Sequence, residues 1–190
     1  MDFGRPALEV APELLGRVLW VRGVGVRLTE VEAYEGADDP ASHAWRGPTP
    51  RNASMFGPPG RLYVYRVHGH HCANIVCDDE GVGAAVLVRA GEVVEGVEVA
   101  RTRRPGVRDE HLARGPGNLT RALGLTRADD GAELGASGVE LGPRDGELGE
   151  ILRGVRVNVS RAFDRPWRFW VEHPSVSALR LHPNARGVGR

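Results

Sequence analysis

The most informative absence in this chain of 190 residues is lysine, because all 25 basic side chains are arginine. Enzymes that form a Schiff base commonly use a lysine amine, so only the N-terminal amine remains for such chemistry. Every strong cation is instead a planar guanidinium, which suits bidentate binding of phosphate and carboxylate groups. The 25 acidic residues bring the formal net charge to zero. This balance excludes a protein that coats nucleic acid or membranes through charge alone.

Cysteines and long apolar runs are also scarce. The two cysteines, Cys72 and Cys77, are five residues apart, and in a strand this odd spacing would place them on opposite faces, so we expect no local disulfide. No apolar run is long enough to span a bilayer, and no signal peptide is recognisable. These features predict a reduced, cytoplasmic protein with no membrane partner.

The zero net charge conceals an uneven distribution. Residues 128–150 contain seven acidic residues and one arginine, whereas residues 151–190 contain eight arginines and only Asp164 and Glu172 as acids. A basic C-terminal segment beside an acidic loop could provide a nucleic-acid face. Scattered, solvated surface charge explains the same counts equally well.

The length of 190 residues predicts a single domain over residues 1–190. Its expected elements are a short helix or turn over residues 6–16, strands from residue 17 and over residues 23–36, an irregular segment over residues 37–60, a hairpin over residues 61–78, a strand from residue 81, a helix over residues 92–103, a helix capped by Asn118, and strands within residues 154–160 and 166–181. Gly69 marks the bend of the hairpin. The sum is an α+β fold with a largely antiparallel sheet and long loops on one side.

The segment "LTEVEAYEGADDPASHAW", residues 28–45, contains the first candidate site. In a strand, Glu30, Glu32 and Tyr34 would share one face, and His43 follows behind a turn rich in Gly, Asp and Pro. Burial of a carboxylate is costly unless it has a partner or a function. The residues alone leave three interpretations open: the polar face of a half-exposed strand, a metal site, or a carboxylate held beside an aromatic pocket.

The expected hairpin contains the second candidate site. Tyr63 and Tyr65 share one face of its first strand, as is typical of cross-strand packing, and the tip carries His68, His70 and His71. Histidine is a poor turn former and a poor core residue, so this tip indicates metal ligation or insertion into a partner. A metal site needs three or four converging ligands, and no known ligand spacing is present.

Insertion into nucleic acid would instead need a projecting side chain flanked by arginines that bind the backbone. Arg61, Arg66 and Arg89 could flank His68 in this way. Arg89 also closes the apolar segment "AAVLVRA", where a solvated charge at the end of a strand is the simpler interpretation.

Longer motifs are more specific than these patterns. The segment "TEVEAYEGADDPASHAWRGPTPRNASMFGPPGRLYVYRVHGHHCANIVCD", followed by "VLVRAGEVVEG", "GPGNLTRALGL" and "RFWVEHPSVS", closely resembles the alkyladenine (3-methyladenine) DNA glycosylases of the mammalian-type, non-helical-hairpin class, as a bacterial member. The resemblance covers residues 1 to about 178 in order. It implies a curved, mainly antiparallel sheet with flanking helices and a protruding hairpin that inserts into DNA.

The resemblance also implies an activity. Such an enzyme of base excision repair flips alkylated or deaminated purines, among them 3-methyladenine, 7-methylguanine, hypoxanthine and etheno-adenine, out of duplex DNA and hydrolyses the N-glycosidic bond. The implied partner is double-stranded DNA that contains damaged purines, and the protein would act as a monomer without cofactor or metal. Strand-nicking glycosylases usually need an amine such as lysine, so we expect an abasic product and no lyase step.

Matched residue by residue, the catalytic motif assigns Glu32 as the general base, which would deprotonate the attacking water and steady an oxocarbenium-like sugar. Arg89 would help to hold this water and a nearby phosphate, and backbone near residues 157–159 would add a carbonyl to the water. Glu30 becomes an outer or surface group.

The pocket motifs assign Tyr34, His43 and Tyr65 as stacking walls for the flipped purine and Asn74 as the residue that screens out normal guanine. The intercalating residue, commonly tyrosine in the vertebrate proteins, is His68 in this sequence, which makes the wedge titratable near neutrality. Expected contacts with the DNA backbone come from Arg51, Tyr63, Arg66, Gly117 and Asn118.

Two other classes of function fit some of the same residues. One is a metal-dependent hydrolase that uses Glu32, His43 and the cluster from His68 to His71. The other is a non-catalytic binder of damaged DNA, although a pure phosphate binder would not place an anion near the backbone.

Overall fold

The computed structural model describes residues 1–136, 138–144 and 146–183. Within these residues the helices and strands are α1 (Ala7–Leu14), β1 (Arg17–Val21), β2 (Val24–Glu35), β3 (Leu62–Val67), β4 (His70–Cys77), β5 (Ala84–Glu95), α2 (Val97–Arg103), α3 (Pro116–Leu123), β6 (Val139–Arg144), β7 (Leu152–Gly154) and β8 (Arg168–Trp170). Short 3-10 helices lie at Gly36–Asp38, Ala53–Phe56, Asp109–His111 and Arg127–Asp129.

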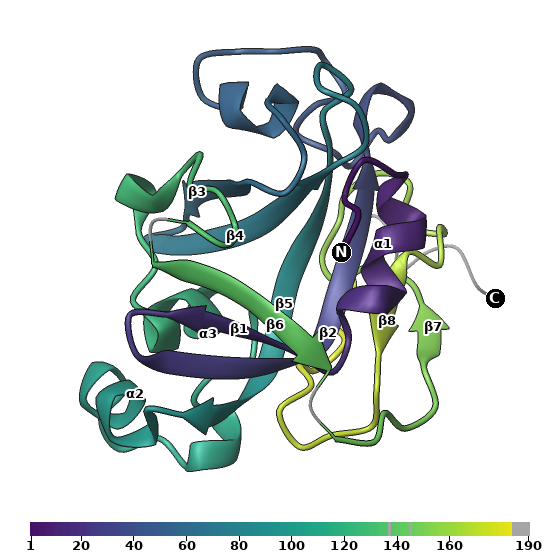
Figure 1. Cartoon of the computed structure of the whole chain (residues 1–190). Coiled ribbons are helices and arrows are strands. Elements are labelled where there is room, and N and C mark those ends of the chain that lie inside the picture. Colours follow the sequence, from purple (N-terminus) through teal and green to yellow (C-terminus); the bar gives the residue numbers. More distant parts are fainter. Residues whose placement is uncertain (137, 145, 184–190) are drawn as a thin grey trace, which may run out of the picture.

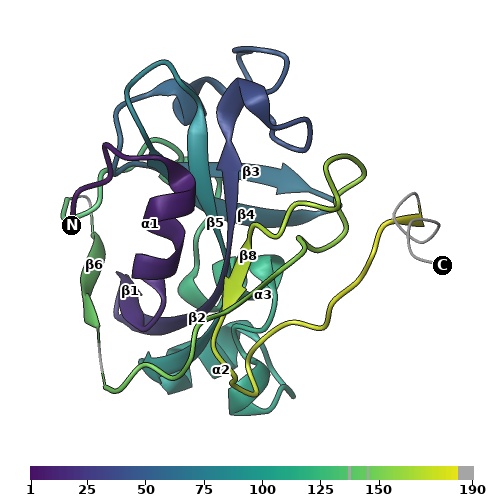
Figure 2. The ribbon, with the colours of Figure 1, turned by 90° about the vertical axis from the view of Figure 1, so that its right-hand side faces the viewer.

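The strands form one twisted antiparallel sheet of eight strands (Figure 1). Its main order is β3-β4-β5-β2-β1-β6, and β8 joins β2 to β7. The long strands β2 and β5 lie at the centre, whereas residues 36–61 form loops beyond one end of the sheet, at the top of Figures 1 and 2. The predicted α+β class and the antiparallel sheet are confirmed.

The central strands have one face toward the core and one toward solvent-accessible cavities. Ala84, Val86 and Val88 of β5 are fully buried in the main hydrophobic cluster, together with side chains of α1 and α3. The alternate residues Leu87 and Arg89 line a groove on the other face. The period of two in a strand therefore separates the residues that stabilise the fold from those available for function.

A local irregularity between β2 and β5 determines where Arg89 lies. Glu30 pairs with Ala90 and Val31 pairs with Val88, so that Arg89 is an extra residue between two successive pairs. A bulge of this kind bends a strand and changes the direction of a side chain. It brings the guanidinium group of Arg89 to the carboxylates of β2.

The predicted hairpin consists of β3 and β4, and its two-residue turn is His68-Gly69. Both residues have positive φ, +46° and +81°, as a type I′ turn requires. Glycine adopts this conformation freely and histidine does so at a small cost. The turn leaves His68 exposed at the tip.

Several predicted boundaries are wrong. Residues 92–95 continue β5 and only Val97–Arg103 is helical, because Gly96 has left-handed φ and separates the two elements. Asn118 does not cap α3: the helix begins at Pro116 with Gly115 in the cap position, and the Asn118 amide donates to the carbonyl of Arg114 over 2.6 Å.

The C-terminal part is less regular than predicted. The strand expected within residues 154–160 does not form: β7 (Leu152–Gly154) ends at the first residue of that range, and the positive φ of Asn158 is incompatible with a continuous strand. Of the expected strand within residues 166–181, only Arg168–Trp170 forms. The acidic segment is more regular than a loop, since Val139–Arg144 forms β6 beside β1.

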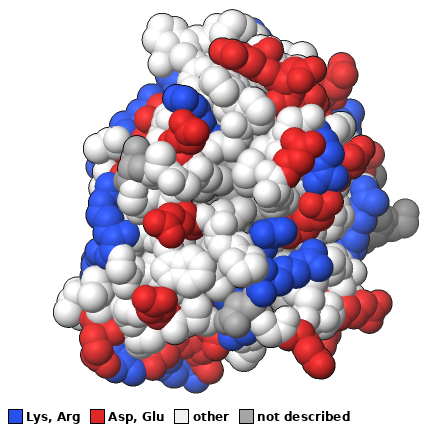
Figure 3. Space-filling model, in the orientation of Figure 1, with Lys and Arg blue, Asp and Glu red and all other residues white. Residues whose placement is uncertain are grey.

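On the face that carries α1 and β6, acidic and basic side chains are mixed and neither sign of charge predominates (Figure 3). Within the described part of the chain, no helix combines the length and the apolar character needed to cross a membrane.

Candidate active site

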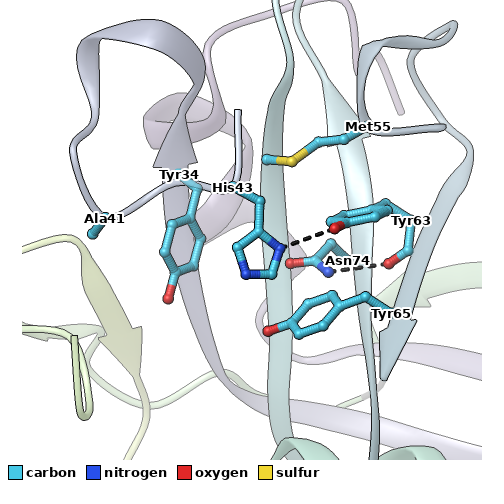
Figure 4. Close-up of a pocket in the computed structure, with 7 residues that line it drawn as sticks. All are labelled: Tyr34, Ala41, His43, Met55, Tyr63, Tyr65 and Asn74. Carbon is cyan, nitrogen blue, oxygen red and sulfur yellow. Dashed lines mark hydrogen bonds between the residues drawn. The ribbon is translucent and has the colours of Figure 1, made fainter. Parts of the chain in front are cut away.

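Aromatic side chains surround a cavity between the end of β2, the loop of residues 36–61 and the hairpin. Its lining residues are Tyr34, Ala41, His43, Met55, Tyr63, Tyr65 and Asn74. Figure 4 shows the Tyr34 ring on one side, facing His43 across the cavity, with Tyr63, Tyr65 and Asn74 beyond His43. These are the only three tyrosines of the chain, so the whole tyrosine content is placed around one cavity.

Contacts among the rings fix the wall opposite Tyr34. The His43 and Tyr65 rings meet edge to face with centroids 4.5 Å apart, and Tyr63 stacks on Tyr65 at 5.4 Å. His43 Nδ1 and the Tyr63 hydroxyl are hydrogen-bonded over 2.9 Å. Desolvation and the nearby charge of Arg51 lower the pKa of His43, so the imidazole is neutral at pH 7.

Asn74 closes the cavity from β4. Its amide donates to the backbone carbonyl of Tyr63 over 3.0 Å, and only 4% of the residue is exposed. This bond holds the side chain in one orientation, with its amide oxygen toward the cavity (Figure 4).

Glu32 is fully buried and is connected to this cavity through Tyr34, a lining residue to which it is hydrogen-bonded. Its Oε2 accepts from the Tyr34 hydroxyl at 2.9 Å and from Arg89 Nη1 at 3.3 Å, and its Oε1 accepts from the backbone amide of Val157 at 2.7 Å. Burial and the negative charge of Glu32 raise the pKa of Tyr34 well above its usual value. The tyrosine is therefore protonated at neutral pH and remains a donor to the carboxylate.

A second fully buried carboxylate, Glu30, lies two residues away and shares Arg89 with Glu32. Glu30 Oε1 accepts from Arg89 at 3.0 Å and from Arg168 at 2.7 Å, and Ser177 donates both its amide and its hydroxyl to the same carboxylate. Burial alone would raise the pKa of Glu30, but the charges of Arg89 and Arg168 together with the two hydrogen bonds from Ser177 outweigh it and hold the pKa below its usual range. Glu30 is thus a buried ion-pair partner of Arg89, and the expectation that it could be a surface residue is wrong.

The cavity opens into a groove of about 660 Å³, within the range of about 300–1,000 Å³ for ligand pockets. Its walls include Tyr34, His43 and Tyr65, and it extends to Arg89, Val157 and the hairpin tip at His68. The loop of residues 155–165 lies beside this tip in Figure 2. The groove therefore connects the exposed tip with the aromatic cavity and with Arg89 and Val157, two of the residues that bond Glu32.

The residues predicted to contact a DNA backbone have different environments. Arg51 and Arg66 are exposed, and Arg51 donates to the carbonyl of Arg66 over 3.0 Å. Gly117 and Asn118 lie at the start of α3 beside His70. Tyr63 is only 1% exposed and bonds His43, so the structure places it in the cavity wall and not on the surface.

The metal-dependent alternative has no support in the geometry. No three His, Cys, Asp or Glu side chains of the described chain, which includes Glu32, His43 and His68–His71, come together in a way that could hold a metal ion. Instead, the ring nitrogen of His43 bonds a tyrosine hydroxyl and the Glu32 oxygens bond three donors. Both cysteines are buried and free.

The site also contains residues that the sequence patterns did not indicate. Met55 lines the cavity from the irregular segment, and the buried pair Asp39–Arg156 lies behind Tyr34. The sequence could indicate only one member of this pair. Asp39 belongs to the Pro-rich turn after β2, but nothing in the sequence connects it to an arginine 117 residues later.

Known proteins resemble this chain over most of its length. The model of the methylpurine-DNA glycosylase family matches residues 1–175. Proteins from Cutibacterium acnes, Mycobacterium sp. (strain KMS) and Streptomyces avermitilis are 48%, 50% and 49% identical to this chain, cover 95%, 96% and 97% of it, and are themselves covered over 99%, 93% and 92% of their lengths. Each is named, as a provisional assignment, a 3-methyladenine DNA glycosylase. The chain belongs to the methylpurine-DNA glycosylase family.

Proposed function

We propose that this protein is a monofunctional DNA glycosylase that flips damaged purines out of duplex DNA and hydrolyses their N-glycosidic bond. The observation that carries the proposal is the position of Glu32: a fully buried carboxylate bonded to a wall of an aromatic cavity and to Arg89. The names of its relatives support 3-methyladenine as a substrate, and we include 7-methylguanine, hypoxanthine and etheno-adenine in the proposed range.

The cavity suits a flat, apolar-faced ligand. A purine that enters the groove would lie between Tyr34 on one side and His43 and Tyr65 on the other, because these three residues line both the cavity and the groove. Stacking on aromatic side chains contributes about 1–3 kcal/mol per base and tolerates different bases. A base inside a duplex cannot reach such a cavity, so binding requires flipping, which is least costly for a damaged pair.

His68 is the side chain that would fill the space left by the flipped nucleotide. It is exposed at the end of a tight turn and lines the same groove as Tyr34 and Arg89. A wedge between base steps compensates for the unstacking that flipping causes.

The bonds of Glu32 indicate how it would activate water. Oε2 already accepts two hydrogen bonds, from Tyr34 and Arg89, whereas Oε1 accepts one, from Val157. A carboxylate oxygen has two lone pairs, so Oε1 has the free one that would take the proton of the attacking water. The negative charge would also stabilise the oxocarbenium-like sugar, as in inverting glycoside hydrolysis.

Alkylated purines such as 3-methyladenine are cationic and leave without protonation, whereas hypoxanthine needs an acid. The lowered pKa of His43 argues against the imidazolium form as that acid at neutral pH. We therefore expect cationic lesions to be the faster substrates.

The absence of lysine supports hydrolysis without a Schiff-base lyase step, and the product would be an abasic site. The test is a base-release assay with duplexes that each contain one defined lesion, at protein in excess over DNA. Released base with an intact strand is expected. Lesion binding without release would identify a non-catalytic binder, and a borohydride-trapped covalent complex would contradict the hydrolytic mechanism.

A further inference from the structure

Behind the Tyr34 ring lies a buried cation that the catalytic motifs do not include. Arg156 is 1% exposed, and its guanidinium carbon is 4.6 Å from the centroid of the Tyr34 ring and 5.0 Å from that of Trp167. Both distances are within the limit of about 6 Å for cation–π attraction. The guanidinium therefore contacts the ring that forms one wall of the cavity.

The carboxylate of Asp39 holds the guanidinium group of Arg156 through two hydrogen bonds. Asp39 is fully buried and accepts from both terminal nitrogens of Arg156, with 2.8 Å between Nη2 and Oδ1. Arg156 Nη1 also donates to the backbone carbonyl of Ala33 over 3.0 Å, between the positions of Glu32 and Tyr34. A planar, bidentate pair of this kind determines orientation as well as position.

The same pair connects two other parts of the site. The carboxylate of Asp39 accepts a hydrogen bond from the backbone amide of Ala41, and its backbone carbonyl accepts one from the amide of Ser42, next to His43. On the other side, the residue after Arg156 is Val157, whose amide donates to Glu32 over 2.7 Å. A displacement of Arg156 would therefore move the Tyr34 ring and one of the three donors to Glu32.

This arrangement is not what stability alone would favour. Buried ion pairs are often replaceable by apolar residues without loss of stability. Arg156 Nε, moreover, is buried without a hydrogen-bond partner among the described residues, and such an unsatisfied group destabilises the folded state. An unsatisfied buried polar group in a native structure is consistent with a role in function.

We infer that Arg156, clamped by Asp39, is a positioning residue of the base-excision reaction: it sets the Tyr34 wall against the flipped purine and the Val157 amide against Glu32. This inference depends on the proposed function. Misplacement of reacting groups by about 1 Å can reduce a rate about 100-fold.

Two variants separate positioning from charge. Arg156→Met retains an unbranched side chain between the two rings and removes the guanidinium. Arg156→Lys retains the positive charge but cannot form the planar bidentate contact. The control is Arg22→Met, which removes the arginine partner of another buried carboxylate, Asp129, in contact with none of the cavity residues.

The first measurement is the rate of base release with protein in saturating excess over lesion DNA. Under these conditions the rate per bound complex does not depend on the fraction of folded protein, so a purely structural role would leave it unchanged. We expect a decrease of about 10- to 100-fold for both Arg156 variants and a change of less than about twofold for Arg22→Met. Wild-type rates in Arg156→Met, or full rescue by Arg156→Lys, would overturn the inference.

The second measurement does not depend on activity. Because the chain has only three tyrosines, fluorine NMR of protein labelled with 3-fluorotyrosine gives three assignable signals, and Tyr34→Phe identifies that of Tyr34. We expect Arg156→Met to shift or broaden the Tyr34 signal most. An unchanged Tyr34 signal would count against the inference, whereas absence of base release by the wild-type protein would reject the proposed function instead.

Discussion

The hydroxyl group of Tyr34 donates a hydrogen bond to Glu32 over 2.9 Å, while the ring of the same residue forms one wall of the aromatic cavity. In the proposed mechanism, Tyr34 would therefore contribute both to base recognition and to water activation. The two contributions can be separated because phenylalanine retains the ring and loses the donor.

Tyr34→Phe should slow base release with little loss of lesion binding. A hydrogen bond to a charged group contributes about 1.5–3 kcal/mol, so we expect a rate about 10-fold or more below that of the wild type at saturating protein. Lesion affinity, measured by fluorescence anisotropy, should change less than about twofold, since stacking remains. Tyr34→Leu, which removes both contributions, should weaken binding as well. Equal rates for Tyr34→Phe and the wild type would exclude a role for the hydroxyl group.

His68→Ala should weaken lesion-DNA binding without destabilising the fold. His68 is exposed at the hairpin tip, and loss of an inserted or stacked side chain costs about 1–3 kcal/mol, which corresponds to about 10-fold in affinity. His70→Ala, at an exposed residue two positions away, is the matched control and should have a smaller effect. A wild-type affinity of His68→Ala for lesion DNA would contradict the wedge.

Glu30 should make stability fall in acid. Its folded-state pKa is held below the usual value, so the unfolded chain binds a proton at higher pH than the folded protein does. Its contribution to the free energy of unfolding is therefore complete above the unfolded pKa of about 4.5 and is lost as pH falls through the folded pKa. Urea unfolding of wild type and Glu30→Gln should show a difference at pH 7 that narrows below pH 4.5. A difference independent of pH would show that the charge of Glu30 does not stabilise the fold.

Arg66 should bind the phosphate groups of DNA through its charge and should not recognise the base sequence. A single phosphate contact contributes about 0.9 to the slope of log K against log salt concentration, so Arg66→Ala should reduce the magnitude of that slope by about one. Arg51→Ala should act similarly, whereas Arg101→Ala, an exposed arginine already paired with Asp109, serves as the control. Binding isotherms between 50 and 200 mM salt, the range over which such contacts matter, provide the comparison.

Part of the site could be predicted from local patterns in the sequence. The alternation in β2 places Glu30, Glu32 and Tyr34 together, and the His-Gly turn identifies the tip of the hairpin. The long segment of residues 36–61 is irregular, as its Pro and Gly content predicts, and only short 3-10 helices interrupt it.

The remainder depends on contacts between distant residues. The bulge that directs Arg89 toward the carboxylates of β2 depends on how β2 and β5 pair. This register cannot be read from the sequence of one strand. Glu30 and Glu32 look equivalent on one strand, and they differ only because Arg168 and Ser177, far along the chain, bind the first while Tyr34 and Val157 bind the second. The pair Asp39–Arg156 is separated by 117 residues. The strand β6 is not predicted because Gly142 and Pro143, two residues that are unfavourable in strands, lie within it.

The most direct test of the account is Glu32→Gln, which retains the shape of the side chain and removes its ability to accept a proton from water. Base release from a duplex with one 3-methyladenine or hypoxanthine should fall by at least about 100-fold at saturating protein, with lesion affinity retained. Glu35→Gln is the control, since Glu35 lies on the same strand but bonds the amide of Leu8, and it should release base at the wild-type rate. Unchanged release by Glu32→Gln would contradict the proposed role of Glu32.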